Sequence, residues 1–221
     1  MISVIIAIYK SEATLERALA SLNDLDITLQ NSLELILVFD GSEHVSREIA
    51  ASCLRKTNYS YLLLDQLHSG VSVARNNGVK NATGEFITFL DADDEILGER
   101  FHFIPDEQSS KIIIGKQQVV VSEDRYLNKP ELLSVVAPSD YHIMSMVLSR
   151  KLFYSVGEFD KNFSVGSDWD FIIRAKSAGF TIDYVDRYFL RRHVHLKNAS
   201  LDVGTLRKEH IQAIRKHIRE E

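Results

Sequence analysis

Apolar runs alternate with amphipathic segments through the first 98 residues, and this alternation predicts the fold class. Runs of bulky, often β-branched residues predict buried strands at residues 2–8, 33–39, 59–64 and 86–90. Segments with helical spacing between them predict helices over residues 12–22, 47–54 and 71–82. Ser11 is placed to cap the first of these helices. Strands that alternate with helices are typical of an α/β fold with a mostly parallel central sheet flanked by helices and right-handed crossovers.

The second half of the chain is less regular. Its pattern predicts short strands at 111–115 and 117–121, a polar excursion at 123–130, a mixed segment at 141–152, a helix at 168–179 and a strand at 181–189. Gly179 suits the left-handed cap that ends such a helix. The whole chain contains only three prolines and no low-complexity run, so no linker is indicated.

Residues 205–221 have the pattern of a basic amphipathic helix. The apolar residues that lie broadly along one side of this helix are Leu206, Ile211, Ile214 and Ile218. We favour docking of the helix on the parent domain, and the alternative is peripheral association with a membrane or a partner. The expected organisation is one domain over residues 1–204, followed by this helix.

Composition and charge narrow the function classes. Apolar residues make up 45% of the chain and charged residues 26%, which is ordinary for a soluble globular protein. The net charge of −5 argues against a nucleic-acid partner and gives no overall attraction to anionic membranes. The single cysteine, Cys53, rules out an internal disulfide and suits a reducing compartment. Neither a signal peptide nor a transmembrane run is recognisable, so we expect a cytoplasmic protein.

Three carboxylates follow the predicted strand at 86–90 within four positions. They are Asp91, Asp93 and Asp94. Because burying unpaired carboxylates is costly, we expect them at the carboxyl end of the strand, where open α/β sheets bind ligands. Asp91 and Asp93 could converge on one hard divalent cation that is shared with substrate phosphates. The alternative is an acidic turn that caps the next helix, and residues 84–94 alone do not decide between the two.

Two further polar residues are expected near the same edge of the sheet. Asp40 ends the second strand and is either a nucleoside-binding carboxylate or a turn residue of Asp40-Gly41-Ser42. Arg75 precedes the strand at 86–90 and has two functional interpretations, pairing with Asp91 or binding a phosphate. A surface salt bridge is its alternative.

A candidate for acid–base chemistry lies further along the chain. The segment Gly166-Ser167-Asp168-Trp169-Asp170 combines a flexible residue, a carboxylate and the only tryptophan. A carboxylate at a helix start beside an aromatic wall could act as a general base on a sugar hydroxyl, and an N-cap is its alternative role. His193 and His195 would point the same way on a strand, so that one could complete a metal shell or both could lie at the surface.

Short motifs that occur in a fixed order make the chain resemble the family 2 glycosyltransferases with the GT-A fold. The resemblance runs from Ile2 to about Ser200. Its motifs are the opening strand 3–9, Val38-Phe39-Asp40-Gly41-Ser42, Ala74-Arg75-Asn76-Asn77-Gly78, Asp91-Ala92-Asp93, Val156-Gly157-Glu158-Phe159-Asp160, Ser167-Asp168-Trp169-Asp170-Phe171 and His195-Leu196-Lys197-Asn198-Ala199-Ser200.

The resemblance implies a donor half, residues 1–98, and an acceptor half, residues 99–204. On the donor side, the residues expected to line the nucleotide-sugar pocket are Ala7, Tyr9, Glu12, Asp40, Arg75, Asp91 and Ala92. Asp93, with Asp91 and His195, would hold a Mn or Mg ion. Asp168 would be the base that deprotonates the acceptor hydroxyl, with Ser167 and Trp169 beside the acceptor. The implied chemistry is a single displacement with inversion at the anomeric carbon.

The same resemblance implies the substrates only as classes. The donor would be a UDP- or GDP-linked sugar and the acceptor a saccharide or a lipid-linked glycan, as in the synthesis of cell-surface polysaccharides or glycoconjugates. The protein would then work in the cytoplasm, at the inner face of the membrane where the acceptor is lipid-linked. No Gln-x-x-Arg-Trp motif follows Asp170, so transfer of a single sugar is favoured over processive synthesis.

Three departures from the family pattern leave a second interpretation open. Lys10 stands where the family usually has Asn, Phe39 replaces the first Asp of Asp-Asp-Gly-Ser, and Ser167 replaces a Glu. Phe39 and Ser167 motivate the alternative of a catalytically degenerate module that only binds sugar nucleotides. A nucleotidyltransferase is a third class, but it would need a glycine-rich phosphate loop after the first strand, and residues 8–20 contain no glycine.

Overall fold

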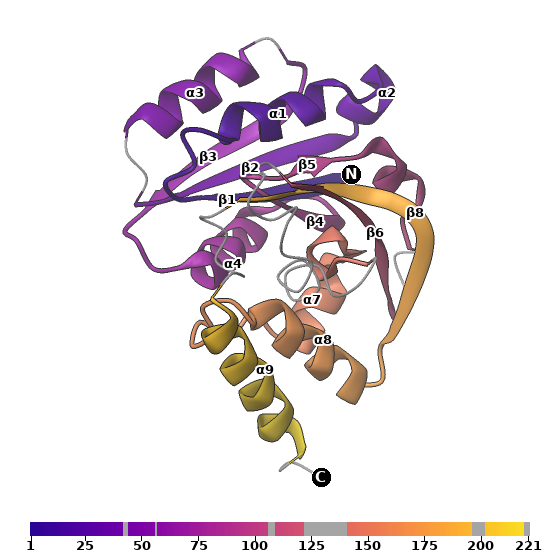
Figure 1. Ribbon diagram of the computed structural model, residues 1–221. Helices are drawn as coiled ribbons and strands as arrows, with labels where there is room; N and C mark the ends of the chain where they lie inside the picture. The colour runs from indigo at the N-terminus through magenta and orange to yellow at the C-terminus, as the bar shows by residue number, and fades with distance from the viewer. Residues whose placement is uncertain (42–43, 56, 106–108, 122–140, 196–201, 219–221) are drawn as a thin grey trace.

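Four parallel strands form one half of an eight-stranded sheet (Figure 1). The computed structural model describes residues 1–41, 44–55, 57–105, 109–121, 141–195 and 202–218. The strands are, in their spatial order, β3 (Ser60–Gln66), β2 (Leu33–Asp40), β1 (Ile2–Ile8) and β4 (Phe86–Asp91). β1 and β2 are almost wholly buried, as their continuous apolar runs predict for strands covered on both faces. The prediction of a parallel sheet in the first half is therefore confirmed.

The second half of the chain extends this sheet with mixed pairing. β7 (Val147–Ser149) pairs antiparallel with β4, so one sheet joins both halves. The sheet continues, in spatial order, through β6 (Lys111–Val121), β8 (Thr181–Val194) and the short β5 (Glu95–Ile96). The outer strands curl over the face of the sheet that the first helix covers. At the edge of the sheet, the Ile96 amide donates a hydrogen bond to the Ser21 hydroxyl of that helix. The curl carries the end of β8 back toward the end of β4.

Helices cover both faces and bury two separate cores. The helices on the first face are α1 (Leu15–Asn23), α2 (Ile27–Gln30) and α3 (His44–Leu54). The second face carries α4 (Val71–Asn81), α7 (Arg150–Val156) and α8 (Ser167–Ser177), while two 3₁₀ turns, η1 (Gly98–His102) and η2 (Ile143–Ser145), connect strands. Alternate residues of β1 enter opposite cores, as with Ile6 and Ile5, because successive side chains of a strand point to opposite faces.

Three local predictions are tested by these elements. Ser11 is not the N-cap of the first helix: α1 begins at Leu15 after Thr14, and the Ser11 hydroxyl donates to the Tyr9 carbonyl instead. The two strands predicted at 111–115 and 117–121 are one strand, β6, interrupted by register shifts on both sides of Lys116, which a bulge produces. Gly179 follows α8 with a φ of +84°, so its predicted cap role is confirmed.

The last helix, α9 (Val203–Ile218), lies against α8 and extends away from the sheet (Figure 1). Docking on the parent domain is therefore confirmed, but the apolar side of the helix is not the side that docks. Glu209 and Ala213 are buried, whereas Ile211 and Ile214 are about half exposed. The helical pattern cannot show this, because the surface that receives α9 is polar: it is a loop of backbone amides described below. The predicted excursion at 123–130 lies outside the described residues.

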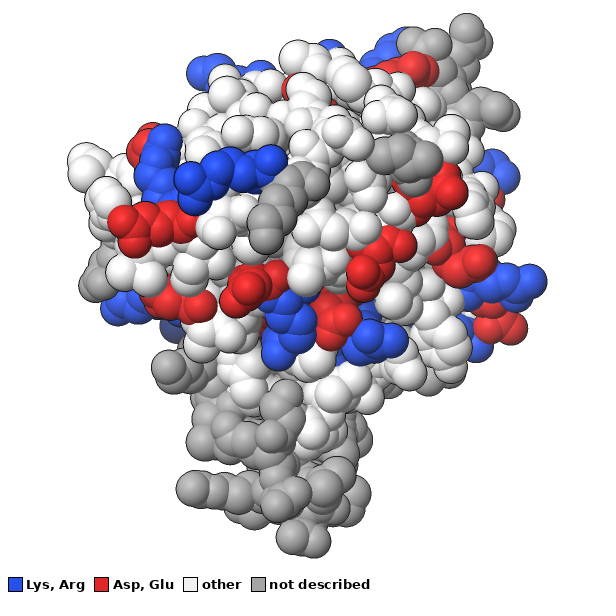
Figure 2. Space-filling model, turned by 90° about the horizontal axis from the view of Figure 1, so that it is seen from above, with Lys and Arg blue, Asp and Glu red and all other residues white. Residues whose placement is uncertain are grey.

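The distribution of surface charge and the character of the helices agree with the expectations from composition. Figure 2 shows acidic and basic side chains interspersed on the described part of the face that α1 and α3 cover, without a broad basic field. Within the described ranges, none of the helices combines the length and the apolar character that crossing a bilayer requires.

Candidate active site

The carboxyl ends of β1, β2 and β4 meet at one edge of the sheet and bring the predicted donor residues together. Ala7 is paired across the ladders with Val38 on one side and Asp91 on the other. Asp40 ends β2 and Asp91 ends β4 at the same end of the sheet, and the register places Asp91 level with Val38, two residues before Asp40. Ligands of open α/β sheets bind at this edge. The structure therefore groups Ala7, Asp40 and Asp91, as the sequence predicts.

Asp40 is fully engaged by the protein itself. Its Oδ1 accepts from the Gln66 side chain and the Ser69 amide, both at 2.8 Å. Its Oδ2 lies 2.9 Å from His68 Nδ1 and accepts from the Gly70 amide at 2.9 Å. The carboxylate is buried and organises the loop that leads into α4. The turn-residue alternative thus describes the geometry best, while direct binding of a nucleoside by Asp40 stays a prediction.

Replacing Asp40 by alanine is expected to destabilise the protein by about 1–3 kcal/mol, because the Ser69 and Gly70 amides lose their acceptor. Donor affinity should fall with it, and metal dependence should not change. Urea denaturation of the free protein measures the first effect. Asp65→Asn is the matched control, because Asp65 is exposed and its ion pair with Arg47 contributes little. Equal stability of the two variants would contradict a structural role for Asp40.

An aromatic pair lies beside this loop. The rings of Tyr9 and His68 stack with centroids 3.9 Å apart, and Tyr9 is 40% exposed. Lys10 has a φ of +51°, a left-handed conformation that asparagine adopts more readily than lysine. The preference for asparagine at this position in the family thus has a backbone explanation. Glu12 is only partly exposed and accepts a hydrogen bond from the Ser46 hydroxyl at 2.8 Å.

Arg75 and Asp91 form the ion pair that was one of the predicted alternatives. Arg75 Nη2 lies 2.5 Å from Asp91 Oδ1, and Arg75 is only 7% exposed, so a surface salt bridge is ruled out. Burial opposes ionisation of Asp91, but the charge of Arg75 outweighs it and lowers the pKa of Asp91. Asp91 is therefore held as a carboxylate with a fixed orientation. Ala92 is buried behind it.

Asp93 faces the end of β8. Its Oδ2 lies 3.1 Å from His195 Nε2, and its backbone carbonyl accepts from Arg17 Nη2 at 2.6 Å. His193 lies in the same stretch but turns to Glu95, with its Nε2 2.5 Å from Glu95 Oε1. Of the two histidines, His195 is the one that meets the predicted metal ligand. The remainder of its motif, 196–200, lies outside the described residues.

Several buried ionisable side chains lie beneath these carboxylates, and most of them could not be predicted from the sequence. Arg100 is fully buried, and burial lowers its pKa to about 9 against the opposing charges of Asp94 and Asp91. Asp94 is buried as well and accepts from the His193 amide, while burial and the neighbouring Asp93 raise its pKa. Burial lowers the pKa of His142 to about 3, so this imidazole is neutral. Arg17, Arg100 and His142 were missed because only the tertiary fold brings them here.

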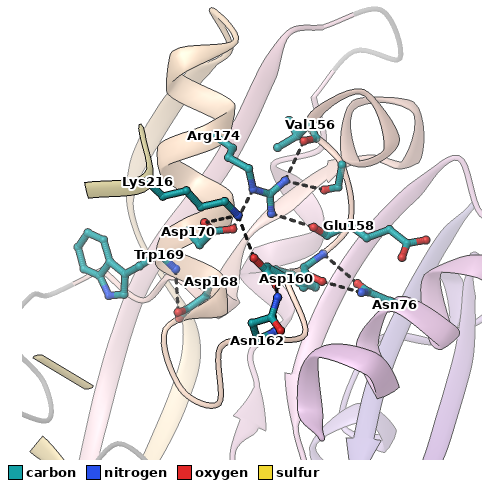
Figure 3. Close-up of polar contacts among 12 residues, drawn as sticks. Asn76, Val156, Glu158, Asp160, Asn162, Asp168, Trp169, Asp170, Arg174 and Lys216 are labelled. Atoms are coloured by element: carbon teal, nitrogen blue, oxygen red, sulfur yellow. Dashed lines mark hydrogen bonds and ion pairs between the residues drawn. The ribbon is translucent and has the colours of Figure 1, made fainter. Parts of the chain in front are cut away.

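The helix α4 connects the donor edge to the acceptor side. Next to Arg75, the Asn76 side chain donates to the Phe159 carbonyl at 2.8 Å and accepts from the Phe159 amide at 3.0 Å (Figure 3). Phe159 belongs to the Gly-x-Phe-Asp motif. Two adjacent residues of one helix therefore fix the end of β4 and the loop that precedes α8.

Asp168 lies in the first turn of α8, where the fold brings it toward the donor edge. Its Oδ1 accepts from the Trp169 amide at 2.8 Å (Figure 3). Burial raises the pKa of Asp168, while the charge of Arg75 lowers it and that of Asp91 raises it further. These interactions place the predicted base on the same side of the sheet as the Arg75–Asp91 pair.

The neighbours of Asp168 differ in their access to a ligand. Trp169 is 43% exposed and its ring meets His210 of α9 edge-on, at 5.1 Å between centroids. Ser167 is buried, so its side chain offers no open surface to an acceptor. Asp170 is fully buried and pairs with Arg174, with 2.8 Å between Oδ2 and Nε, as a structural residue would. Of the predicted acceptor residues, Trp169 alone is accessible.

Comparison with known proteins identifies the sequence family and the fold. Residues 3–104 match the family model described as Glycosyl transferase family 2. The chain is 27% identical over 183 residues to the glycosyltransferase GlyA of Streptococcus pneumoniae serotype 4, covering 79% of this chain and 24% of that protein. It is 28% identical over 179 residues to the cholesterol galactosyltransferase of Borreliella burgdorferi, covering 78% and 48%. The resemblance to family 2 glycosyltransferases is thus confirmed, with the family model covering residues 3–104.

A solved structure confirms the GT-A fold. TarS of S. aureus, residues 1–349, superposes with a TM-score of 0.64 at 22% identity, covering 87% of this chain and 60% of that one. The same protein in complex with UDP-GlcNAc superposes with a TM-score of 0.67, also at 22% identity, covering 91% and 60%. The chain therefore spans 60% of the TarS fragment and 24% and 48% of the two curated relatives named above.

Proposed function

We propose that this chain transfers a single sugar from a nucleotide-sugar donor to a saccharide or lipid-linked acceptor, with inversion and with a divalent cation. One observation carries the proposal. Through Arg75 and Asn76, one helix joins the Asp91 strand end to the loop that leads to Asp168. A donor diphosphate at Asp91 and an acceptor at Asp168 would then lie next to each other beside Arg75 of α4.

The donor is proposed to be UDP-linked, with GDP as the alternative. Support comes from TarS, which has been crystallised with UDP and with UDP-GlcNAc. In this chain the stacked Tyr9 and His68 rings lie at the end of β1 beside the loop that Asp40 organises. A base could lie along this partly exposed aromatic surface, with Glu12 and Ala7 nearby in sequence.

The residues present fit a Mn or Mg ion that is shared with the donor. Asp93 and His195 approach each other from two elements, and carboxylates are suitable ligands for both cations. Among the described residues, no three side chains of the metal-binding types cluster into a complete site. Mg and Mn commonly share themselves between protein carboxylates, substrate phosphates and water, and such an ion would stabilise the negative charge of a departing diphosphate. Asp91, held by Arg75, would face the ribose and metal-bound water.

The transfer itself is proposed to depend on Asp168. Its carboxylate takes the proton of the acceptor hydroxyl while the oxygen of that hydroxyl bonds to the anomeric carbon. The bond between that carbon and the diphosphate breaks in the same step, on the opposite face, and inversion follows. Trp169 offers an aromatic surface for the acceptor sugar. Arg75 forms its ion pair with Asp91, and this pairing keeps Asp91 charged.

The structure removes one motive for the degenerate-binder alternative. Phe39 is buried in the core that α1 and α3 share, because it points to the opposite face of β2 from Asp40. Its replacement of an aspartate therefore leaves the carboxyl edge of the sheet unchanged. Ser167 is buried as well, so its effect would be on the loop and not on the base.

Location at the inner face of a membrane is part of this proposal where the acceptor is lipid-linked. α9 carries the partly exposed Ile211 and Ile214 together with exposed Arg207 and Lys208. Apolar and basic side chains on one helix are the composition of segments that rest on anionic bilayers. The rest of the chain is expected to lie in the cytoplasm.

Thermal unfolding with nucleoside diphosphates tests the donor site. We expect UDP or GDP to raise the melting temperature only when Mn or Mg is present. At a ligand concentration of one hundred dissociation constants, the stabilisation should be about 2.7 kcal/mol. Transfer from the corresponding nucleotide sugars to a panel of acceptors then separates an enzyme from a binder. The proposal fails if no nucleoside diphosphate with a metal changes the melting temperature.

A further inference from the structure

The buried Glu209 of α9 is bound entirely to one short loop. Its Oε1 accepts from the Ser164 amide at 2.9 Å and from the Ser164 hydroxyl at 2.7 Å. Its Oε2 accepts from the Val165 amide at 2.8 Å and the Gly166 amide at 2.7 Å. Three consecutive amides thus converge on one carboxylate, only two residues before Asp168. Glu209 is 7% exposed.

These contacts keep the carboxylate charged. Burial alone would raise the pKa of Glu209, but the hydrogen bonds from Ser164, Val165 and Gly166 lower it below its ordinary value. Charge-assisted bonds of this kind are stronger than neutral ones, and consecutive amides form a natural anion site. The loop is therefore attached to α9 by a strong polar contact that needs the negative charge.

The same loop sets the start of α8. Gly166 is the N-cap residue of α8 and has no side chain with which to cap it. A Cβ at Gly166 would lie 3.1 Å from Cβ of Glu209, so glycine permits this close approach. With no side-chain cap, the direction in which α8 begins depends on how Glu209 holds the preceding amides. Asp168 is the second residue of that helix.

Lys216 attaches α9 to both sides of the loop (Figure 3). Its Nζ lies 2.9 Å from Asp160 Oδ2, before the loop, and 3.9 Å from Asp170 Oδ1, after it. Asp170 also pairs with Arg174, whose guanidinium donates to the carbonyls of residues 156–158. α9 therefore spans the segment from the Gly-x-Phe-Asp motif to the first turn of α8.

We propose that Glu209 is a positioning residue: α9 holds residues 160–167 so that Asp168 is presented to the acceptor in a fixed orientation, with Lys216 as the second attachment. The inference rests on the proposed role of Asp168 as the base. It assigns the C-terminal helix a part in transfer, beyond docking. Catalytic groups tolerate little displacement, since an error of about 1 Å can cost 10²-fold in rate.

Glu209→Gln tests this, because glutamine keeps the size of the side chain but loses the charge and one acceptor oxygen. Transfer by this variant should fall about 10–100-fold in kcat, with the dissociation constant of the metal–nucleotide complex unchanged. Asp202→Asn is the matched control: it makes the same chemical change on the same helix, where Asp202 caps the first turn and asparagine caps equally well. The control should transfer at the native rate.

The combination with Asp168→Asn distinguishes positioning from general damage. If Glu209 acts through Asp168, the double variant transfers no more slowly than Asp168→Asn alone. If Glu209→Gln merely lowers the amount of folded protein, the two losses multiply, and that result overturns the inference. Should Glu209→Gln fail to fold, Lys216→Met takes its place in the same comparison, with Lys151→Met, at an exposed position of α7, as its control.

Two measurements on the free protein test the attachment without substrate. In Glu209→Gln, the amides of Ser164, Val165 and Gly166 should exchange hydrogen faster than in the native protein, while those of the central strands should not. Fluorescence of the single Trp169 should change as its contact with His210 loosens. Unchanged exchange in this loop overturns the inference whatever the activity. If exchange in the loop is faster in Glu209→Gln, as expected, but the native protein binds no nucleotide, the proposed function is refuted and the attachment by Glu209 is not.

Discussion

Asp168→Asn is expected to slow sugar transfer by roughly 10²–10⁴-fold, the usual contribution of a general base. The variant should bind metal and nucleotide normally, because Asp168 lies in the first turn of α8, whereas the proposed metal and nucleotide ligands follow β1, β4 and β8. A sugar hydroxyl is a weak nucleophile, and asparagine has no basic site with which to take its proton. Initial rates with saturating donor, together with a nucleotide titration, measure the two effects separately.

The pH dependence of the transfer rate is a second test of the role of Asp168. The base must be ionised to act, and burial raises the pKa of Asp168. Transfer should therefore decline with falling pH at values above the ordinary range for aspartate, and the low-pH limb should be absent from the residual activity of Asp168→Asn.

Asp170→Asn is the matched control for this prediction. Asp170 is fully buried beside Arg174 and Lys216, so its loss should cost about 1–3 kcal/mol of stability before it affects chemistry. Denaturation curves and rates on the folded fraction separate the two. Native turnover by Asp168→Asn, or an inactive but normally stable Asp170→Asn, would show that the base is assigned to the wrong residue.

Asp93→Ala is expected to abolish the metal-dependent stabilisation by UDP or GDP while leaving the fold intact. The Asp93 side chain is 29% exposed and lies beside His195 at the carboxyl end of the sheet, so its truncation removes little buried surface. The whole stabilisation of about 2.7 kcal/mol at one hundred dissociation constants should disappear. For a chain of this length that is a shift of several degrees in the melting temperature.

The control for Asp93→Ala keeps the charge change but moves it away from the site. Asp183 is exposed on β8 and pairs with Lys111, so Asp183→Ala should retain the native response to metal and nucleotide. Removal of the metal from the native protein with a chelator should reproduce the behaviour of Asp93→Ala. Full metal-dependent binding by Asp93→Ala would disprove the assignment of the Asp-x-Asp motif.

Local patterns decided most of the elements. The continuous apolar runs of β1, β2 and β4 predict strands covered on both faces, because only such strands need no polar side. The position of Asp91 and Asp93 after one of these runs predicts the edge at which they lie. These inferences need only the neighbours of a residue in the chain, so the fold class and the carboxylates of the donor edge were predictable.

Long-range partners were not predictable in the same way. The sequence left Arg75 with alternatives, and only its burial beside Asp91 decided between them. Asp40 had two predicted roles, as a nucleoside-binding carboxylate or a turn residue, and its hydrogen-bond partners in the loop at 66–70 could not be predicted. A side chain chooses its partner among groups that the tertiary fold brings near, and periodicity along the chain contains no information about these groups.

The C-terminal helix α9 shows most clearly the difference between what local patterns predict and what the tertiary structure decides. Its 3.6-residue pattern correctly predicted a helix that docks, but the apolar stripe through Ile211 and Ile214 is not the face that docks. The face that docks is defined by Glu209, because the loop beneath α9 offers three amides that a buried carboxylate can satisfy. The sequence by itself determined most of the elements, the parallel strands of the first half and the resemblance to family 2 glycosyltransferases. The tertiary structure alone decided which polar groups meet, since each buried donor or acceptor must find its partner among distant segments.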